Sequence, residues 1–419
     1  MLSRRMALGL LLTGLLVSGG CSVFSPAEAK SSKPRRDAPA LTADDDPIAA
    51  LAQTLNPLVF TEAEAANVTY SPMSIALALG MLRAGATGES ARQLDAVFGS
   101  GSRLHDRMNA AEHGLTALAG ERKNSSGEKT DVTVDSACAV WAQEGVAWTQ
   151  AYLDLLAVTY GAGVRLSDFA EDPDGARKSI NSFVADHTRD KIPDLMPPDS
   201  VTTMTRMVLV NALYLKVPWW EAFPDATQKP FHAPSGEVSA PSVSSTLHTS
   251  YQQADNYQTV AIPYAGNELA MTVVLPDDGA ENAVGNQLGS ITMAGASTDR
   301  REVRLTMPLF DLDSKVDLAL VLRQAGVTAV FDARGDFRPM SDDPAVDLFV
   351  SAMLHRATVT IDEEGTEAAA ATAIAMDTTA APPDEPVEVV VDRPFFFVIH
   401  DTRVGMPLFV GRVMDPTKP

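Results

Sequence analysis

The chain has 419 residues, of which 45% are hydrophobic and 21% are charged, and its formal net charge at pH 7 is −21. This composition is typical of a globular protein that is long enough to bury a large core, in one domain or in two smaller ones. A surface this acidic repels nucleic acid and anionic lipid headgroups, so the charge argues against a protein that binds phosphate backbones.

Residues 1–20 have the pattern of a secretory signal: a positive start, an apolar run from Met6 to Val17, and then small residues. The apolar run is too short to span a bilayer well. Cys21 follows Ser-Gly-Gly as in a bacterial lipobox, although Ser18 stands where that motif usually has leucine. The sequence therefore predicts a lipoprotein of a bacterial cell envelope, anchored outside the cytoplasm by lipid on Cys21. The alternative is ordinary cleavage nearby, which would give a secreted protein.

The segment 21–46 is small, charged and proline-bearing, without hydrophobic periodicity, and we expect it to be a flexible tether. From Pro47 to Pro419 the sequence contains no internal repeat and no second linker. We therefore expect residues 47–419 to form a single domain.

Several elements of this domain can be predicted in chain order. Apolar residues at helical spacing predict a first helix, and a second begins with Ser71 as its N-cap and Pro72 in its first turn. Continuous apolar runs predict buried strands, and the last part of the chain is rich in strands. The predicted helices are 48–60, the helix that begins at Pro72, 89–99 and 317–326; the predicted strands are 207–219, 269–276, 348–362 and those that follow residue 386.

Motifs of known enzymes are missing from the sequence. It contains no Gly-x-Ser-x-Gly elbow, no His-Glu-x-x-His pair and no phosphate-binding glycine loop. The seven histidines are scattered without metal-ligand spacing, and Cys138 in an alternating apolar stretch is most simply a small buried residue. We therefore expect neither an enzyme nor a metal or other cofactor.

The segment 360–383, "TIDEEGTEAAAATAIAMDTTAAPP", is alanine-rich, polar and free of large side chains. Its composition alone fits a surface helix or an alanine-rich linker equally well. As a strand, it would present small residues on both faces and could therefore enter a sheet without clashing. One face would carry Thr366, Ala368, Ala370, Thr372 and Ile374, and the other Glu367, Ala369, Ala371, Ala373 and Ala375.

The chain from Pro47 onward resembles the serpin family in five segments that occur in the family's order. Segment 67–94 contains the pattern of the family's buried second helix, "SPMSIALALGMLRAGATGES". In the segment "INSFV", Phe183 replaces the usual tryptophan, and in "VNALYLKVPW", Val217 replaces the usual glycine while Trp219 takes the tryptophan position. The hinge strand and the C-terminal signature complete the resemblance. The five segments are 67–94, 177–196, 208–223, 355–373 and 392–416.

The resemblance implies an α+β serpin fold: a single domain with a large central, mostly antiparallel β-sheet, further β-sheets, about eight to nine helices and an exposed reactive-centre loop over about 363–388. It also implies an irreversible suicide-substrate inhibitor of serine proteases, or in some members of cysteine proteases, that forms a covalent acyl complex and acts as a monomer. The alternative within the same fold is a non-inhibitory binding protein or a simple protease substrate.

The resemblance identifies two groups of site residues. The loop hinge comprises Glu363, Glu364, Gly365, Thr366, Glu367, Ala368, Ala369, Ala370, Ala371 and Thr372, and its small residues, with no proline, are those of inhibitory members. Glycine at 365 would let the backbone swing. The polar cluster expected to control strand opening comprises Ser71, Ser74, Asn211 and His355, with Trp219.

The hinge length that is usual in the family predicts a scissile bond between Thr379 and Ala380. Counting back from the C-terminal signature gives a site near Pro383 instead, and residues 376–378 are further alternatives. No lysine or arginine occurs from Ala357 to Asp392, so a trypsin-like protease would find no cationic residue here. Small residues suit an elastase-like or subtilisin-like protease.

Overall fold

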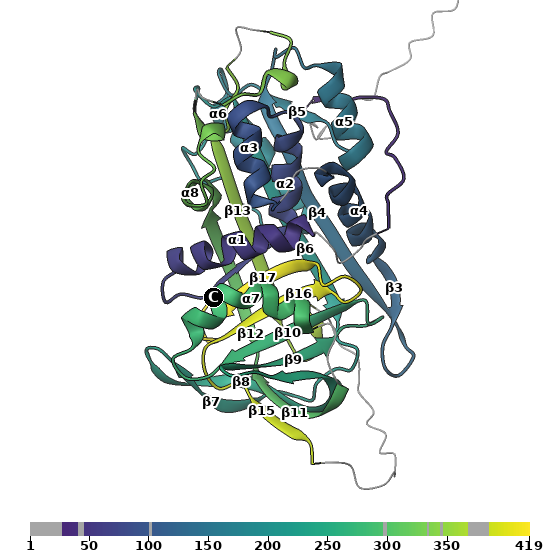
Figure 1. Ribbon diagram of the computed structural model, residues 1–419, viewed down its shortest axis with the longest axis vertical. Coiled ribbons are helices and arrows are strands. Elements are labelled where there is room, and N and C mark those ends of the chain that lie inside the picture. Colours follow the sequence, from purple (N-terminus) through teal and green to yellow (C-terminus); the bar gives the residue numbers. More distant parts are fainter. Residues whose placement is uncertain are drawn as a thin grey trace, which may run out of the picture.

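In a computed structural model of the chain, the structure describes residues 27–40, 46–99, 103–295, 300–332, 335–343, 347–367 and 385–419. These residues form two large β-sheets and eight α-helices, with most of the helices around the upper part of one sheet (Figure 1). The predicted α+β fold with a large, mostly antiparallel sheet is therefore confirmed.

Several helices begin at a residue whose side chain caps them. In the second helix, the Ser71 hydroxyl accepts a hydrogen bond from the N–H of Ser74 at 3.1 Å, and Pro72 stands in the first turn, as predicted. No helix in the described part of the chain is both long and apolar enough to cross a bilayer. The helices are α1 (Pro47–Glu62), α2 (Pro72–Ala84), α3 (Gly88–Val97), α4 (Leu104–Ala117), α5 (Gln150–Tyr160), α6 (Pro173–His187), α7 (Glu281–Gly295) and α8 (Leu318–Gln324).

The central sheet has eight strands in the order β1-β5-β4-β6-β14-β13-β12, with β3 beside β4. All neighbours are antiparallel except β4 with β5, and β6 with β13 where those two pair directly. The strands are β1 (Glu28–Ala29), β3 (Gly120–Lys123), β4 (Lys129–Gln143), β5 (Val164–Ser167), β6 (Met207–Pro218), β12 (Phe310–Asp317), β13 (Ala352–Ile361) and β14 (Gly365–Thr366).

The second sheet has nine strands in the order β15-β11-β8-β9-β10-β16-β17-β2, with β7 beside β8. Helices α1 and α7 lie over its β16–β17 region (Figure 1). Its strands are β2 (Val68–Tyr70), β7 (Thr227–Ala233), β8 (Gly236–Gln253), β9 (Tyr257–Pro263), β10 (Leu269–Pro276), β11 (Arg300–Pro308), β15 (Val387–Val390), β16 (Phe395–Asp401) and β17 (Pro407–Val413).

Strand β6 is apolar on both faces because helices cover both sides of the central sheet. Leu209 and Leu213 pack into the main core, which also contains α2. The alternate residues Val210 and Ala212 pack with Val184 and other residues of α6 in a second apolar cluster. A strand buried on both faces has a continuous hydrophobic run instead of an alternating one, which is the pattern that made β6 predictable.

The first described segment, residues 27–40, packs against the domain, whereas the sequence predicted a flexible tether through residue 46. Strand β1 pairs antiparallel with β5 at the edge of the central sheet. Asp154 on α5 then holds the segment by accepting hydrogen bonds from the Ser31 hydroxyl at 2.5 Å and from Lys33 at 2.7 Å. The Lys33 contact is the largest of the hydrogen bonds that lower the pKa of Asp154 to about 2.

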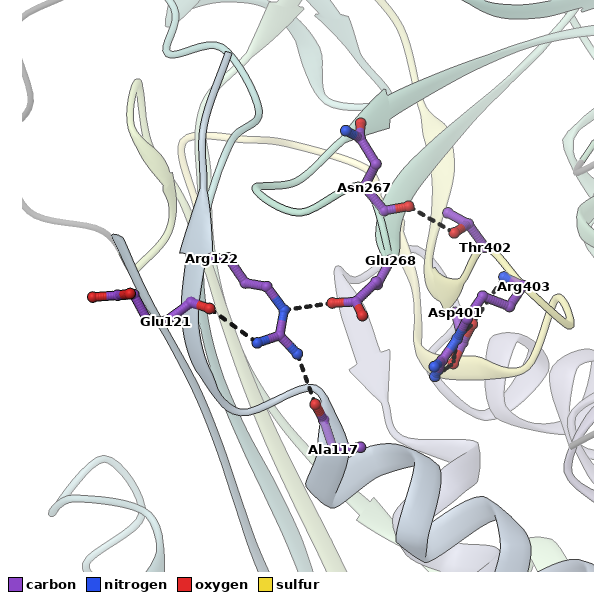
Figure 2. Close-up of polar contacts among 8 residues, drawn as sticks. All are labelled: Ala117, Glu121, Arg122, Asn267, Glu268, Asp401, Thr402 and Arg403. Carbon is purple, nitrogen blue, oxygen red and sulfur yellow. Dashed lines mark hydrogen bonds and ion pairs between the residues drawn. The ribbon is translucent and has the colours of Figure 1, made fainter. Parts of the chain in front are cut away.

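Charged side chains also join elements of the two sheets (Figure 2). Arg122 of β3 donates to the Glu268 carboxylate at 2.5 Å, next to β10, and to the carbonyl of Ala117 at the end of α4 at 2.7 Å. In the turn after β16, the Thr402 hydroxyl donates to the Asn267 carbonyl at 2.8 Å. The Arg122–Glu268 contact fixes the β3–β4 hairpin against the nine-stranded sheet, and the Thr402–Asn267 bond joins two turns within that sheet.

Candidate functional site

The predicted hinge begins with a tight turn after β13. The Asp362 carboxylate accepts hydrogen bonds from the N–H groups of Glu364 at 2.9 Å and Gly365 at 2.8 Å, which is the local bonding that favours aspartate in turns. Burial raises the pKa of Asp362 despite these bonds. The Glu363 carbonyl accepts from the N–H of Phe223 at 2.8 Å. The turn sends the chain back into the central sheet as β14.

A stacked pair of aromatic rings supports this turn. The Trp219 indole N–H donates to the Asp362 carbonyl at 3.0 Å, and the Trp219 backbone N–H donates to the Glu364 carbonyl at 2.8 Å. The indole stacks on Tyr264, with ring centroids 4.4 Å apart and an interplanar angle of 9°. The backbone of the turn is therefore fixed directly before Gly365.

Residue 365 must be glycine because its backbone lies very close to the backbone of β6. A Cβ atom at this position would lie 2.4 Å from the Val217 carbonyl oxygen and 2.6 Å from the Pro218 Cα. Real Cβ atoms do not approach backbone this closely, so any other residue would push β14 out of the sheet. The sequence predicted this glycine for its flexibility, and the structure adds that only glycine fits the docked hinge.

The two residues after Gly365 are held by side-chain contacts. Thr366 is 2% exposed, and its hydroxyl lies 2.7 Å from the Tyr264 hydroxyl. The Glu367 carboxylate forms an ion pair of 3.2 Å with Lys191, and its backbone N–H donates to the Thr360 carbonyl at 3.2 Å. The hinge therefore enters the sheet in a defined register.

The central sheet has a gap where the hinge enters. Strands β6 and β13 pair directly only between 208–211 and 352–355. At the other end of the gap, Thr366 lies between Val217 of β6 and Ile361 of β13. No described strand lies between residues 212–216 and 356–360, which face each other across the gap.

The closed end of the gap carries the predicted polar cluster. His355 Nε2 accepts the backbone N–H of Ser71 at 2.9 Å, and its Nδ1 contacts the Asn211 side-chain oxygen at 2.5 Å. Ser74 donates to the Ser71 hydroxyl. Because Nε2 accepts, the ring is neutral with its proton on Nδ1, and burial lowers the pKa of His355 to about 4. Four of the five residues predicted for this cluster therefore meet.

Trp219 does not belong to this cluster. It follows β6 directly, whereas Asn211 lies near the beginning of the same strand, so the two residues are separated by about 26 Å at the usual rise of a strand. Trp219 instead supports the hinge at the opposite end of the gap. The sequence pattern identifies Trp219 as the family's tryptophan but does not show at which end of the gap it lies.

Sequence reasoning missed Tyr264 and Lys191, which hold the hinge, and it did not connect Cys138 to the polar cluster. The Cys138 sulfur lies 3.7 Å from the Ser74 hydroxyl. Burial raises the pKa of the Cys138 thiol. These residues lie far from the hinge or the cluster along the chain, so no local pattern could have identified their roles.

Several predicted site residues lie outside the described residues. They are Cys21, Ala368, Ala369, Ala370, Ala371, Thr372, Thr379 and Ala380. Near the predicted end of the loop, at about 388, β15 begins at Val387 and pairs with β11. Among the described residues, no group of three or more histidine, cysteine, aspartate or glutamate side chains could hold a metal ion.

This fold and site define a class of protein in which a hinge enters a gap in a large central sheet. Residues 48–416 match the family model described as serpin, serine protease inhibitor. The chain belongs to the serpin family. Similar solved structures include the thermophilic serpin tengpin in its native state, with a TM-score of 0.81 and 23% identity, covering 93% of this chain and all of that one.

Relatives with similar sequences come from distant organisms. The leukocyte elastase inhibitor of Bos taurus is 32% identical, over 84% of this chain and 94% of that protein. Iripin-8 of Ixodes ricinus is 32% identical, over 83% of this chain and 87% of its own length. An uncharacterised serpin-like protein of Thermococcus kodakarensis is also 32% identical, over 84% of this chain and 81% of its own length.

Proposed function

We propose that this serpin is an irreversible suicide-substrate inhibitor of serine proteases. The protease serine attacks the carbonyl of Thr379, the bond to Ala380 breaks, and the new amino terminus leaves with the proton. The protease remains bound to Thr379 as an acyl ester while the severed loop enters the central sheet. Insertion then moves the protease and distorts its active site before water can release it.

The observation that supports this proposal is the register of the docked hinge. Thr366 pairs with Ile361 on one side and Val217 on the other. A strand continued in this register would bring residue 372 opposite both His355 and Asn211, which are themselves partners at the closed end of the gap. The gap therefore matches the length of the predicted hinge, and both neighbouring strands give the same register.

The side chains of the predicted hinge also suit this gap. In the same register, residues 368 and 370 would lie opposite Val359 and Ala357, whose side chains are buried in the main core. Alanine at these positions adds no bulk, and each new backbone hydrogen bond contributes about 1 kcal/mol. Insertion is favourable in this account because it converts solvated backbone into sheet.

An elastase-like or subtilisin-like protease is the proposed target, because the loop offers small residues around Thr379 and no cation from 357 to 392. The name of the related leukocyte elastase inhibitor of Bos taurus supports the same class. Cysteine proteases remain a second group of targets to test.

The test is incubation of the purified chain with elastase-like, subtilisin-like, trypsin-like and papain-like proteases, followed by denaturing gels and mass mapping of the cut. An inhibitor gives a complex that survives SDS, with the new amino terminus at Ala380. Clipped product without a complex would indicate the alternative, a simple substrate, and no cleavage would indicate a non-inhibitory binding protein.

The variant Thr366→Arg separates insertion from cleavage. A buried arginine beside Tyr264 and Trp219 would prevent the hinge from entering the sheet, so the protein should become a substrate. Thr203→Arg, at an exposed threonine, is the matched control and should keep its inhibitory activity. Undiminished stoichiometric inhibition by Thr366→Arg would contradict the assigned hinge.

Loop insertion should also be visible without a target. Cutting the loop with a protease that the protein does not trap should raise the melting temperature, because the intact fold is kinetically trapped. An unchanged melting temperature after cleavage would show that no additional strand forms.

We further propose that the protein acts as a monomer anchored to a bacterial envelope by lipid on Cys21, or is secreted if cleavage occurs nearby. Cys21→Ser should release it from the membrane fraction, whereas the control Cys138→Ser should not. Membrane attachment that survives Cys21→Ser would exclude lipidation.

A further inference from the structure

A hollow of about 820 Å³ lies between α1 and α7, over the edge of β16 and β17, and none of the hinge residues lines it. Its apolar wall includes Phe60 of α1 and Phe396 of β16, two buried rings with centroids 5.1 Å apart. The volume is in the range of small-molecule sites, which are typically apolar with a few polar groups.

Arg412 of β17 lines this hollow and is 7% exposed. Its NH2 group donates to the carbonyls of Glu64 and Ala66, but its Nε is buried and has no hydrogen-bond partner. Within the described residues it forms no ion pair, and its guanidinium lies 5.5 Å from the centre of the Phe60 ring. Burial without a carboxylate partner lowers the pKa of Arg412.

A second guanidinium lies at the mouth of the hollow. Arg393, which is half-buried, donates from Nε to the Pro276 carbonyl at 3.0 Å and forms ion pairs with Asp278 at 3.5 Å and with Asp392 at 3.3 Å. The Asp278 side chain is 96% exposed, so the ion pair with Asp278 is weak and could be replaced by the carboxylate of a ligand while Asp392 stays in place.

Buried charges in proteins are normally paired, because removing a lone charge from water is costly. Arg412 lacks such a partner, and the surface beside it is aromatic. The rim also carries the acidic residues Glu64, Asp278 and Glu281, which would repel a ligand with several negative charges. The site therefore favours one negative charge on a flat apolar body.

The geometry points to this hollow as a binding site for a small aromatic monocarboxylate, whose carboxylate pairs with Arg412 and Arg393 and whose ring packs on Phe60 and Phe396. The site is separate from the hinge, so it does not depend on the proposed inhibitory function. Nothing in the binding requires cleavage of the loop.

Naphthalene-2-carboxylate is a suitable probe, with naphthalene-2-carboxamide as its uncharged match, and titration calorimetry on the full chain is the measurement. The carboxylate should bind at least about tenfold more tightly than the carboxamide, which corresponds to about 1.4 kcal/mol. Arg412→Met should remove this difference, and Arg412→Lys should keep part of it because it retains the charge.

A pair of variants on α7 tests the location without altering the buried arginine. Asn286→Phe would fill the hollow from an exposed position and should abolish binding of the probe, whereas Ala283→Phe, exposed on the same helix but outside the hollow, should not. The assignment fails if neither compound binds, if both bind equally, or if Asn286→Phe binds as well as the unmodified protein. If Arg412→Met does not fold, the α7 pair still decides the location.

Discussion

The hydroxyl groups of Thr366 and Tyr264 lie 2.7 Å apart, and both residues are buried. The Tyr264 ring stacks on Trp219, whose indole N–H binds the carbonyl of Asp362 at the start of the hinge. Thr366, the second residue of β14, is thus held by the same aromatic pair that fixes the preceding turn.

We expect Tyr264→Phe to weaken the docking of the hinge, because the Thr366 hydroxyl would be left buried without its partner. An unsatisfied buried hydroxyl costs about 1–3 kcal/mol, which urea unfolding can measure. Adding Thr366→Val should recover part of this loss, because both polar groups are then removed. Tyr257→Phe, at a half-buried tyrosine of β9, is the control; an equal effect there would contradict the specific role of Tyr264.

Gly365→Ala should displace β14 from the sheet, since its Cβ would overlap the backbone of Val217 and Pro218. Overpacking of this kind typically costs about 1–3 kcal/mol. Hydrogen exchange should show faster exchange of the Trp219 backbone N–H, which is bound to the Glu364 carbonyl. Gly127→Ala, with φ of 80° and no atom near its Cβ, measures the cost of backbone strain alone. If the two variants behave alike, the close approach to β6 has no effect.

Acidification should destabilise the folded protein through His355. Its pKa is about 4 in the folded protein, against about 6.5 when unfolded, so the unfolded chain binds the additional proton first. The contribution of His355 to the free energy of unfolding is therefore fully present above pH 6.5. It falls by about 3 kcal/mol as the pH decreases to 4. Protonated Nε2 would also face the N–H of Ser71, which it can no longer accept.

Urea unfolding midpoints between pH 7 and pH 4 test this prediction. Burial also lowers the pKa of His105, to about 4, and the pKa of His400, so the pH dependence of stability in the unmodified protein contains all three histidines. In His355→Gln the urea midpoint should change less with pH, while His248→Gln, at an exposed histidine, should keep the pH dependence of the unmodified protein. Equal pH dependence in all three proteins would exclude His355 as the origin.

Asp154→Ala should release residues 27–40 from the domain, because Asp154 binds both Ser31 and Lys33. Brief trypsin digestion can detect this release, since the bonds after Lys30, Arg35 and Arg36 would become cleavable, whereas residues 357–392 contain no trypsin site. The control is Asp225→Ala, at an exposed aspartate. Unchanged cleavage in this region would show that other contacts hold the segment.

The sequence was sufficient for elements whose patterns are local. Ser71 and Pro72 marked the start of α2, and the continuous apolar run of β6 marked a strand that is buried on both faces. Both of these predictions depend on neighbours in the chain. The hinge at Gly365 and Thr366 was predicted from the family resemblance instead, because its composition alone fits a helix or a linker equally well; in the structure these two residues form β14.

Contacts between distant segments could not be predicted in the same way. Residues 27–40, which belong to the predicted tether, contact the domain because Ser31 binds Asp154, 123 positions away, and β1 pairs with β5. Tyr264 contacts Thr366 across 102 positions. Polar composition without periodicity does indicate a lack of local structure, but it does not show whether another part of the protein binds the segment.

The two ends of the gap should affect loop insertion differently: one end its equilibrium, and the other its rate. Residues that hold Thr366 act on a strand that has already begun to form, so changing them shifts the equilibrium between docked and undocked states. His355 and Asn211 join β6 to β13 at the far end, where any longer insertion must first part the two strands. Substitutions there should alter chiefly the speed of the conformational change, and in the proposed mechanism this speed would decide whether a protease is trapped or escapes.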